Sequence, residues 1–302
     1  YDTLKQNTSL LNKVSQKYGV PDYVLVAFLG LESNYGNYTG NLSLVQSLAT
    51  LAFDPRRSDF FTGELIALLK LIDKDKIPLN AKGSWAGAMG AVQFMPSNVQ
   101  AYGVDADKDG DIDLWNSQED IYASAANFLK HLGWKKGQKW GREATIPKNF
   151  DYRLTGLQTK KKVTDWNSLG IRKANGAALP NSSMQASLIV PMGHRGPAFL
   201  VYQNFSAILG WNRSLLYALS VGYLADRIKG QGKLRAQPLD EPLLTNENIK
   251  TIQQILNILG YDAGVADGIL GSKTRSATRK FQRDIGMVAD GYVGYELLEK
   301  LQ

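Results

Sequence analysis

The longest apolar run in the chain, residues 23–31, is followed at once by one acidic residue, Glu32. Val24, Phe28 and Leu31 recur at the spacing of one helical face, and the other apolar residues of the run widen that face. The pattern therefore predicts a core helix that is buried on nearly all sides and ends at an acid.

Glu32 is the first candidate for chemistry. The turn-forming residues 33–36, Ser-Asn-Tyr-Gly, place it in the last turn of the predicted helix, and Pro21 suits the first helical position. The negative end of the helix dipole and desolvation by apolar neighbours both disfavour a carboxylate there, so we expect a raised pKa for Glu32. A general acid requires such a pKa. The alternative is a surface glutamate whose charge stays in water.

The rest of the pattern predicts a helical body with an inserted sheet. Helical spacing recurs up to residue 133, which makes the first third of the chain all-helical, and it returns after residue 198. Between Trp134 and Pro197, Gly, Pro and basic residues separate short apolar runs, which predicts a small β subdomain. The predicted helices cover residues 1–20, 41–53, 60–72, 117–133, 199–209 and 214–228.

A segment rich in small residues, 83–97, separates two of these helices. Its glycines and alanines allow close approach by a backbone or a ligand, and two polar side chains, Ser84 and Gln93, interrupt it. Gly-Ala spacing also occurs where elements simply pack tightly, and this alternative stays open.

An acidic loop, residues 105–113, reads Asp-Ala-Asp-Lys-Asp-Gly-Asp-Ile-Asp. Oxygen ligands at positions 1, 3 and 5 and glycine at position 6 match the calcium-loop pattern, whose alternative is a solvated acidic turn. Position 12 is Asn116 instead of the usual glutamate, and Glu119 follows at position 15. Ser117 and Asp120 form an N-cap pair that opens the next helix.

Composition narrows the class of protein. The chain has 302 residues, of which 44% are hydrophobic and 21% charged, so it has room for one large and one small domain. It has no cysteine, and its longest apolar run is far below the roughly 20 residues of a membrane span. Because it begins at Tyr1 without Met, we expect that an upstream targeting segment was removed.

The net charge of +7 is distributed unevenly. Residues 130–173 contain twelve Lys or Arg and three acidic residues, a net charge of +9, whereas residues 240–302 carry a net charge of −2. This basic block indicates a polyanionic partner, either nucleic acid or an anionic cell-wall polymer, unless it is only a solvated lysine-rich face. No recognisable nucleic-acid-binding motif accompanies it.

The C-terminal part reads as a separate small module. Residues 230–242 are rich in Gly, Pro and charge, which is typical of a linker. Beyond it, Ala-Asp-Gly-Ile-Leu-Gly at 266–271 recurs as Ala-Asp-Gly-Tyr-Val-Gly at 289–294, each time before a helix-like run. About sixty residues without a catalytic constellation indicate a binding module.

The motifs together resemble a known family. Residues 1 to about 230 are similar, motif by motif and in order, to the B-type lytic transglycosylases of bacterial cell walls, glycoside hydrolase family 103, and the tail resembles the small helical peptidoglycan-binding domain. The resemblance implies a mainly α fold: a lysozyme-like α+β core with a small inserted β subdomain and a helical C-terminal domain. The implied boundaries are 1–232, linker 233–243, and 244–302. The motifs are Glu32–Gly36, Ser84–Gly90, Gln93–Ser97, the acidic loop, Trp211–Ser214, and in the tail Leu256–Tyr261, Thr274–Ala277 and Phe281–Gln282.

The resemblance also implies a reaction. Glu32 is the sole catalytic acid and base for cleavage of the β-1,4 bond between N-acetylmuramic acid and N-acetylglucosamine, which leaves a 1,6-anhydro end. The implied partner is the peptidoglycan glycan strand, the compartment is the periplasm, and no organic cofactor is expected. The implied glycan-contacting residues are Tyr35, Ser84, Met89, Gln93, Phe128, Trp211, Asn212 and Tyr217, and the implied ligands of a structural calcium ion are Asp105, Asp107, Asp109, the Asp111 carbonyl and Glu119.

Two departures and three alternatives accompany this interpretation. Trp211 and Phe128 stand where the family pattern has Tyr, so we expect ring packing or stacking on a sugar there without a hydroxyl contact. A hydrolytic muramidase would need a second, unrecognised carboxylate. A non-catalytic scaffold would only bind the cell wall, and a nucleic-acid binder is the remaining alternative.

Overall fold

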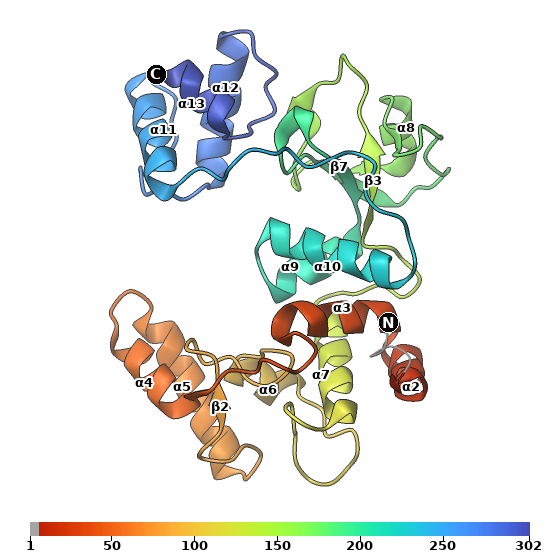
Figure 1. The fold of residues 1–302 in the computed structure, drawn as a ribbon, viewed down its shortest axis with the longest axis vertical. Coiled ribbons are helices and arrows are strands. Elements are labelled where there is room, and N and C mark those ends of the chain that lie inside the picture. The colour runs from red at the N-terminus through yellow and green to blue at the C-terminus, as the bar shows by residue number, and fades with distance from the viewer. Residues whose placement is uncertain (1–5) are drawn as a thin grey trace. The chain divides into compact units, whose positions relative to one another are not determined.

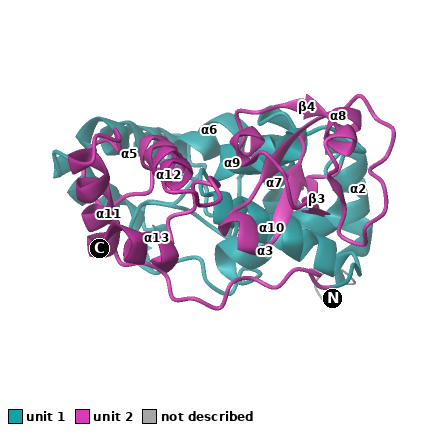
Figure 2. Cartoon of the chain, turned by 90° about the horizontal axis from the view of Figure 1, so that it is seen from above, with its two compact units in different colours: residues 1–138, 203–232 teal, residues 139–202, 233–302 magenta. Residues whose placement is uncertain are grey.

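The computed structural model describes residues 6–302, and these form two compact units (Figures 1 and 2). Unit 1 comprises Tyr1–Gln138 and Gln203–Gly232, and unit 2 comprises Lys139–Tyr202 and Lys233–Gln302. The mainly α fold with a small sheet subdomain agrees with the sequence-based prediction. No helix in this described part of the chain combines the length and apolar character needed to cross a membrane.

Unit 1 is the helical body. Its elements are α2 (Thr8–Tyr18), α3 (Asp22–Ser33), β1 (Leu42–Ser43), α4 (Leu44–Phe53), α5 (Ser58–Asp73), β2 (Lys82–Gly83), α6 (Pro96–Tyr102), α7 (Gln118–His131), α9 (Gln203–Trp211) and α10 (Leu215–Ile228). The helix predicted over 1–20 is thus described from Thr8, and residues 1–5 lie outside the described part.

Helix α3 is the core of unit 1. Its residues 24–29 are all buried, and the helix packs against α10, α2 and α7. Two details of the prediction were wrong. Pro21 is the N-cap with an extended backbone, one position before the helix, and Leu31 is 40% exposed because the last turn of α3 reaches the surface.

The periodicity had predicted an all-helical first third, but this part of the chain also contains a short β ladder. Leu42 pairs with Gly83 and Ser43 with Lys82 in a short antiparallel ladder, β1–β2. The Ser43 hydroxyl also accepts a hydrogen bond from the Gln46 N–H and so caps α4. A two-residue ladder is too short to leave a period of its own in the sequence.

Unit 2 contains the inserted sheet, as predicted. The five strands follow the order β4-β6-β7-β3-β5, and all recorded pairs are antiparallel. The sheet extends further than expected, because residues 198–201, predicted as the start of a helix after residue 198, pair with both β3 and β6. The elements are β3 (Gly141–Thr145), η1 (Tyr152–Leu154), β4 (Lys161–Lys162), α8 (Val163–Ser168), β5 (Arg172–Lys173), β6 (Gln185–Ile189), η2 (Gly193–Arg195) and β7 (Ala198–Val201).

The C-terminal module of unit 2 consists of α11 (Asn246–Ile258), α12 (Ser272–Asp284) and α13 (Tyr295–Leu301) around its own apolar cluster. The preceding segment, residues 229–245, has no helix or strand. It is nevertheless fixed to the sheet, because the Glu143 carboxylate on β3 accepts the backbone N–H groups of Arg235 and Ala236 at 2.7–3.0 Å.

Glycines in unit 1 give a test of this packing. Gly90 has a φ of +65°, and an added Cβ would collide with the Leu114 backbone, whereas Gly63 inside α5 has open space around it. We expect Gly90→Ala to lower the free energy of unfolding by about 2 kcal/mol or more. Gly63→Ala should raise it by about 0.5–1 kcal/mol. Urea unfolding of both variants checks this pair, and equal effects would contradict the described backbone at Gly90.

Candidate active site

The Glu32 carboxyl group is held by two aromatic donors. The Trp211 indole N–H donates to Oε1 of Glu32 at 2.8 Å, and the Tyr217 hydroxyl donates to the same oxygen. Trp211 is the last residue of α9, and Tyr217 lies in the first turn of α10. Within residues 6–302, Oε2 has no recorded hydrogen-bond partner. One oxygen is therefore anchored, and the other is available to a ligand.

Burial dominates the electrostatics of this carboxyl group. Desolvation raises the pKa of Glu32, and the hydrogen bonds from Tyr217 and Trp211 oppose the rise without cancelling it. Burial and the adjacent Glu32 also raise the pKa of Tyr217, so this phenol stays protonated and remains a donor. The raised pKa of Glu32 predicted from its place at the end of an apolar helix is confirmed.

The turn after α3 folds Tyr35 back onto that helix. Asn34, Tyr35 and Gly36 all have positive φ, and the Tyr35 N–H donates to the Leu29 carbonyl at 3.0 Å. This reversal folds the Tyr35 ring back over Gly30, where an added Cβ would lie 2.9 Å from the ring. Glycine at position 30 therefore leaves room for an aromatic side chain next to the turn of Glu32.

A cluster of three phenylalanine rings packs against Trp211. The rings of Phe28, Phe94 and Phe128 lie 4.5, 5.2 and 5.2 Å from that of Trp211. Phe128 is 6% exposed and Met89 is fully buried. The aromatic cluster encloses Phe128, and two β-bridges hold Met89 in the core, so contact of these two side chains with a glycan stays a prediction.

The segment of small residues is a compact irregular loop. The Ser84 hydroxyl accepts the N–H groups of Ala86 and Ala88, which closes a turn. Gln93 has a positive φ, and its amide donates to the carbonyls of Thr39 and Gly90 at 3.2 and 2.8 Å. Both predicted polar side chains are thus half-buried and shape this loop. Asn212 is exposed, and its side chain caps the turn before α10 by accepting the Ser214 N–H.

The Glu64 carboxylate is a buried group that the sequence analysis missed. It lies on α5 and accepts both the N–H and the hydroxyl of Ser97, at 2.9 and 2.7 Å. It thereby fixes the end of the loop that carries Gln93. The sequence did contain a signal for this group, because Glu64 is an acidic residue among the apolar residues of a predicted amphipathic helix.

The acidic loop gathers part of the predicted metal site. Carboxylate oxygens of Asp105, Asp107 and Asp120 lie within 4.8 Å of one another. The carboxylates of Asp109 and Glu119 are outside this group, although Glu119 neighbours Asp120 in the first turn of α7. The Asp111 carbonyl, which is not a side-chain group, stays a predicted ligand. Asp120 is the ligand candidate that the sequence analysis had assigned only to the helix cap.

The carboxylate oxygens gathered in this loop suit a hard cation. Backbone N–H groups of Lys108 and Gly110 donate to Asp105, and Gly110 has the positive φ expected at position 6 of a calcium loop. Burial raises the pKa of Asp120, and the nearby negative charge of Asp107 adds to the rise. A divalent cation among these oxygens would remove that repulsion.

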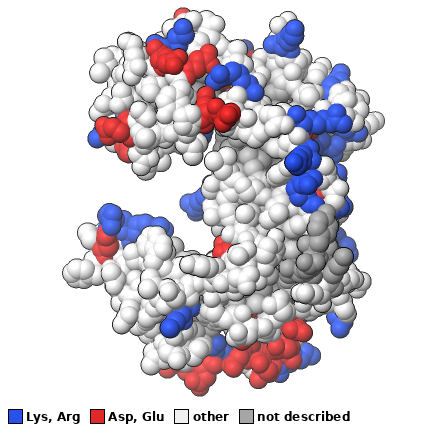
Figure 3. Space-filling model, viewed as in Figure 1, with Lys and Arg blue, Asp and Glu red and all other residues white. Residues whose placement is uncertain are grey.

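The charges lie on separate parts of the surface. Figure 3 shows Lys and Arg gathered over the sheet subdomain, which carries most of the basic block of residues 130–173, and acidic side chains gathered near the acidic loop. A basic face on the sheet subdomain suits an anionic polymer.

Comparisons with known proteins now define the family. The Transglycosylase SLT domain family matches residues 1–226, and a peptidoglycan-binding-domain family matches residues 245–301. The membrane-bound lytic murein transglycosylase B of Escherichia coli K12 is 34% identical over 230 residues, which cover 74% of this chain and 61% of that protein. The chain therefore spans about three fifths of that relative, and it belongs to the Transglycosylase SLT domain family.

Solved structures support the same assignment. SltB3 from Pseudomonas aeruginosa, in complex with NAG-anhNAM-pentapeptide, has a TM-score of 0.96 and 44% identity over 99% of this chain and 81% of its own. The Escherichia coli lytic transglycosylase Slt35 in complex with calcium has a TM-score of 0.65 and 36% identity over 75% of this chain and 72% of its own. The lysozyme-like fold expected from the resemblance is confirmed by these relatives.

The effect of the two hydrogen bonds on the pKa of Glu32 can be tested. Each lowers the pKa of Glu32 against the larger effect of burial, so Tyr217→Phe should raise that pKa further above 4.5, the ordinary value. NMR titration of the ¹³C-labelled carboxyl, assigned by its loss in Glu32→Gln, measures this shift. Tyr223→Phe, the same change on the same helix, should leave the value unchanged. A lower pKa in Tyr217→Phe would contradict the described contacts.

Proposed function

We propose that the chain is a lytic transglycosylase that cleaves the β-1,4 bond between N-acetylmuramic acid and N-acetylglucosamine in peptidoglycan. One observation carries the proposal: a single desolvated carboxyl, Glu32, is anchored through one oxygen by two neutral donors. The relative SltB3 in complex with peptidoglycan fragments supports the choice of substrate.

The proposed reaction needs only this one acid. Protonated Glu32 donates its proton from Oε2 to the glycosidic oxygen while the C1–O bond breaks, and the 2-acetamido oxygen of the muramic acid attacks C1. The Glu32 carboxylate then takes the proton of the C6 hydroxyl, whose oxygen displaces the acetamido oxygen from C1. The products are a free 4-hydroxyl and a 1,6-anhydro end, and no water is consumed.

The neighbours of Glu32 suit both halves of this cycle. As an acid, Glu32 accepts on Oε1 and keeps its proton on Oε2; as a base, its negative charge is stabilised by the same two donors. Its pKa is shifted by burial and these bonds, and no acidic neighbour within residues 6–302 contributes. A hydrolytic muramidase, by contrast, needs a second carboxylate to activate water.

Other residues have proposed roles in holding the glycan and the wall. Tyr35 and Asn212 are exposed, and Ser84, Gln93 and Trp211 are half-buried, so all five offer surface to a sugar. The Trp211 ring can add stacking on that sugar. We assign residues 1–232 to catalysis and 244–302 to wall binding, joined by 233–243. The basic block then faces the carboxylates of stem peptides, and the site of action is the periplasm.

Calcium is proposed as a structural ion of the acidic loop, held by Asp105, Asp107 and Asp120 with Asp109, Asp111 and Glu119 as further candidates. Because only the folded state would bind the ion, 1 mM calcium should raise the midpoint temperature of thermal unfolding. Excess chelator should reverse this rise. Asp107→Asn should reduce the calcium-dependent rise by at least half, whereas the exposed control Asp59→Asn should retain it. An unchanged midpoint of the parent protein in calcium would overturn the proposal.

Product analysis tests the function directly. Purified peptidoglycan incubated with the protein should release muropeptides lighter by one water than hydrolysis products, as measured by mass spectrometry. Glu32→Gln should reduce release by about 10²- to 10⁴-fold, the usual contribution of a general acid. Glu299→Gln, the same change at an exposed position of α13, should match the parent.

Each other result has a distinct meaning. Reducing-end muropeptides would identify a muramidase and overturn the single-acid mechanism. Binding to peptidoglycan with no release by either the parent or Glu32→Gln would identify a non-catalytic scaffold. Salt-dependent retention on DNA without binding to peptidoglycan would identify a nucleic-acid binder.

A further inference from the structure

The duplicated Asp-Gly turns of the C-terminal module have the same internal structure. In the first, Oδ1 of Asp267 accepts the Ile269 N–H at 2.9 Å, and Gly268 has a φ of +78°. The Gln253 side chain of α11 bridges the turn: its amide donates to Asp267 Oδ1 at 3.2 Å, and its oxygen accepts the Gly268 N–H at 2.9 Å.

The second turn repeats each of these contacts. Oδ1 of Asp290 accepts the Tyr292 N–H at 2.8 Å, and Gly291 has a φ of +74°. The Gln282 side chain of α12 donates to Asp290 Oδ1 and accepts the Gly291 N–H, at 2.9 and 2.8 Å. The two turns are therefore two copies of one structural unit, and a contact made by one copy shows what the other can bind.

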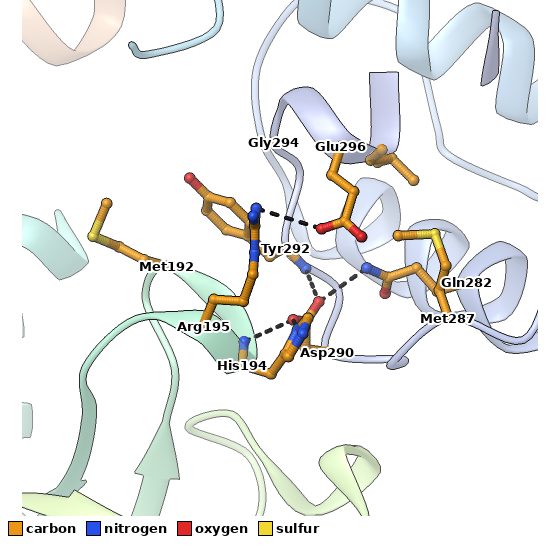
Figure 4. Close-up of a pocket in the computed structure, with 10 residues that line it drawn as sticks. Met192, His194, Arg195, Gln282, Met287, Asp290, Tyr292, Gly294 and Glu296 are labelled. Atoms are coloured by element: carbon orange, nitrogen blue, oxygen red, sulfur yellow. Dashed lines mark hydrogen bonds and ion pairs between the residues drawn. The ribbon is translucent and has the colours of Figure 1, made fainter. Parts of the chain in front are cut away.

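The second copy is occupied by a segment of the sheet subdomain (Figure 4). Oδ2 of Asp290 accepts both the backbone N–H and the Nδ1–H of His194, at 2.8 and 2.7 Å. Gly193 has a φ of +70°, and an added Cβ would lie 2.6 Å from this oxygen and 2.8 Å from Tyr292 Cβ. The turn thus binds a peptide N–H that follows a residue with positive φ and no side chain on its L face.

The first copy has the same groups but no such occupant. Oδ2 of Asp267 has no recorded partner within residues 6–302. Its flanking residues Val265 and Ile269 are 80% and 68% exposed, whereas Val288, the counterpart of Val265, is 39% exposed. An acceptor oxygen, which the equivalent turn uses against a peptide segment, and two apolar side chains therefore face solvent.

We propose that the first Asp-Gly turn is a peptide-binding site, with the stem peptide of peptidoglycan as its ligand; this rests on the proposed function. Residues of D configuration adopt positive φ as readily as L residues adopt negative φ, so D residues of a stem peptide reproduce the geometry of Gly193. Asp267 accepts the peptide N–H that follows a D residue, and Val265 and Ile269 contact its methyl groups. The glycan alone lacks this backbone.

The exposed cation near this turn fits the same ligand. Lys273, at the start of α12, lies 3.5 Å from Asp262 at the surface and packs against Gly264. Because an exposed pair of this kind is weak, the ammonium group can instead meet a carboxylate of the stem peptide. The first turn and its surroundings thus offer both an acceptor for a peptide N–H and a cation for a free carboxylate.

The test uses the full chain carrying Glu32→Gln and a synthetic stem pentapeptide without sugar. On titration, we expect the NMR amide signals of Gly268 and Ile269 to shift. Asp267→Asn keeps Oδ1 as an acceptor but replaces Oδ2 with a donor, so it should weaken binding by about 5- to 10-fold. Glu299→Gln removes one negative charge from the same module at an exposed position and should bind like the parent. The all-L pentapeptide should bind at least about 5-fold more weakly.

Other outcomes overturn the inference. Equal affinity for Asp267→Asn and the parent, with unchanged thermal midpoints, would place the peptide elsewhere. Equal shifts with a sugar oligomer lacking peptide would make this a glycan site. A concentration-dependent dimer that Asp267→Asn abolishes would make the turn a contact between copies. If the parent protein still releases anhydro-muropeptides in any of these cases, only this inference fails and the proposed function stands.

Discussion

Burial of one carboxyl group is the constraint on which unit 1 depends. A helix end next to apolar side chains is unfavourable for a negative charge, and desolvation raises the pKa of Glu32 despite two hydrogen bonds. Neutral donors orient the carboxyl without supplying a full opposing charge, whereas an arginine at the same distance would favour the ionised form and remove the acid. The choice of Trp211 and Tyr217 thus preserves both orientation and a raised pKa.

This constraint explains the packing around the site. Two donors on one oxygen must arrive from a fixed direction, and Trp211 is fixed by three phenylalanine rings at 4.5–5.2 Å. Phe128 packs on Trp211 in this support and Met89 is buried in the core, and their contact with a glycan stays a prediction from the sequence motifs.

The sequence was informative where local chemistry decides the structure. The end of α3, the cap at Ser117, the inserted sheet and the repeated turns all follow from short-range patterns. It was uninformative where partners lie far apart: Trp211 and Glu32 are 179 residues apart, and Glu64 and Ser97 are 33 apart. Asp120 could be read only as a cap, because its proximity to Asp105 arises from the folding of the loop onto α7. No periodicity records such contacts.

The two Asp-Gly turns show how identical local structure can have different uses. Gln, Asp and Gly fix the turn in both copies, so the difference arises from what surrounds it. In the second copy Tyr292 replaces Ile269, and its hydroxyl donates to Glu241 at 2.9 Å, while Arg195 lies 3.5 Å from the same residue. These polar contacts surround the docked Gly193–His194 segment and fix the module to the sheet. The first copy has an apolar isoleucine at the same position, which offers a partner contact area but no fixed hydrogen bond. Such a surface suits a ligand that must bind and leave, because it lacks the further polar contacts that hold the segment at the second turn.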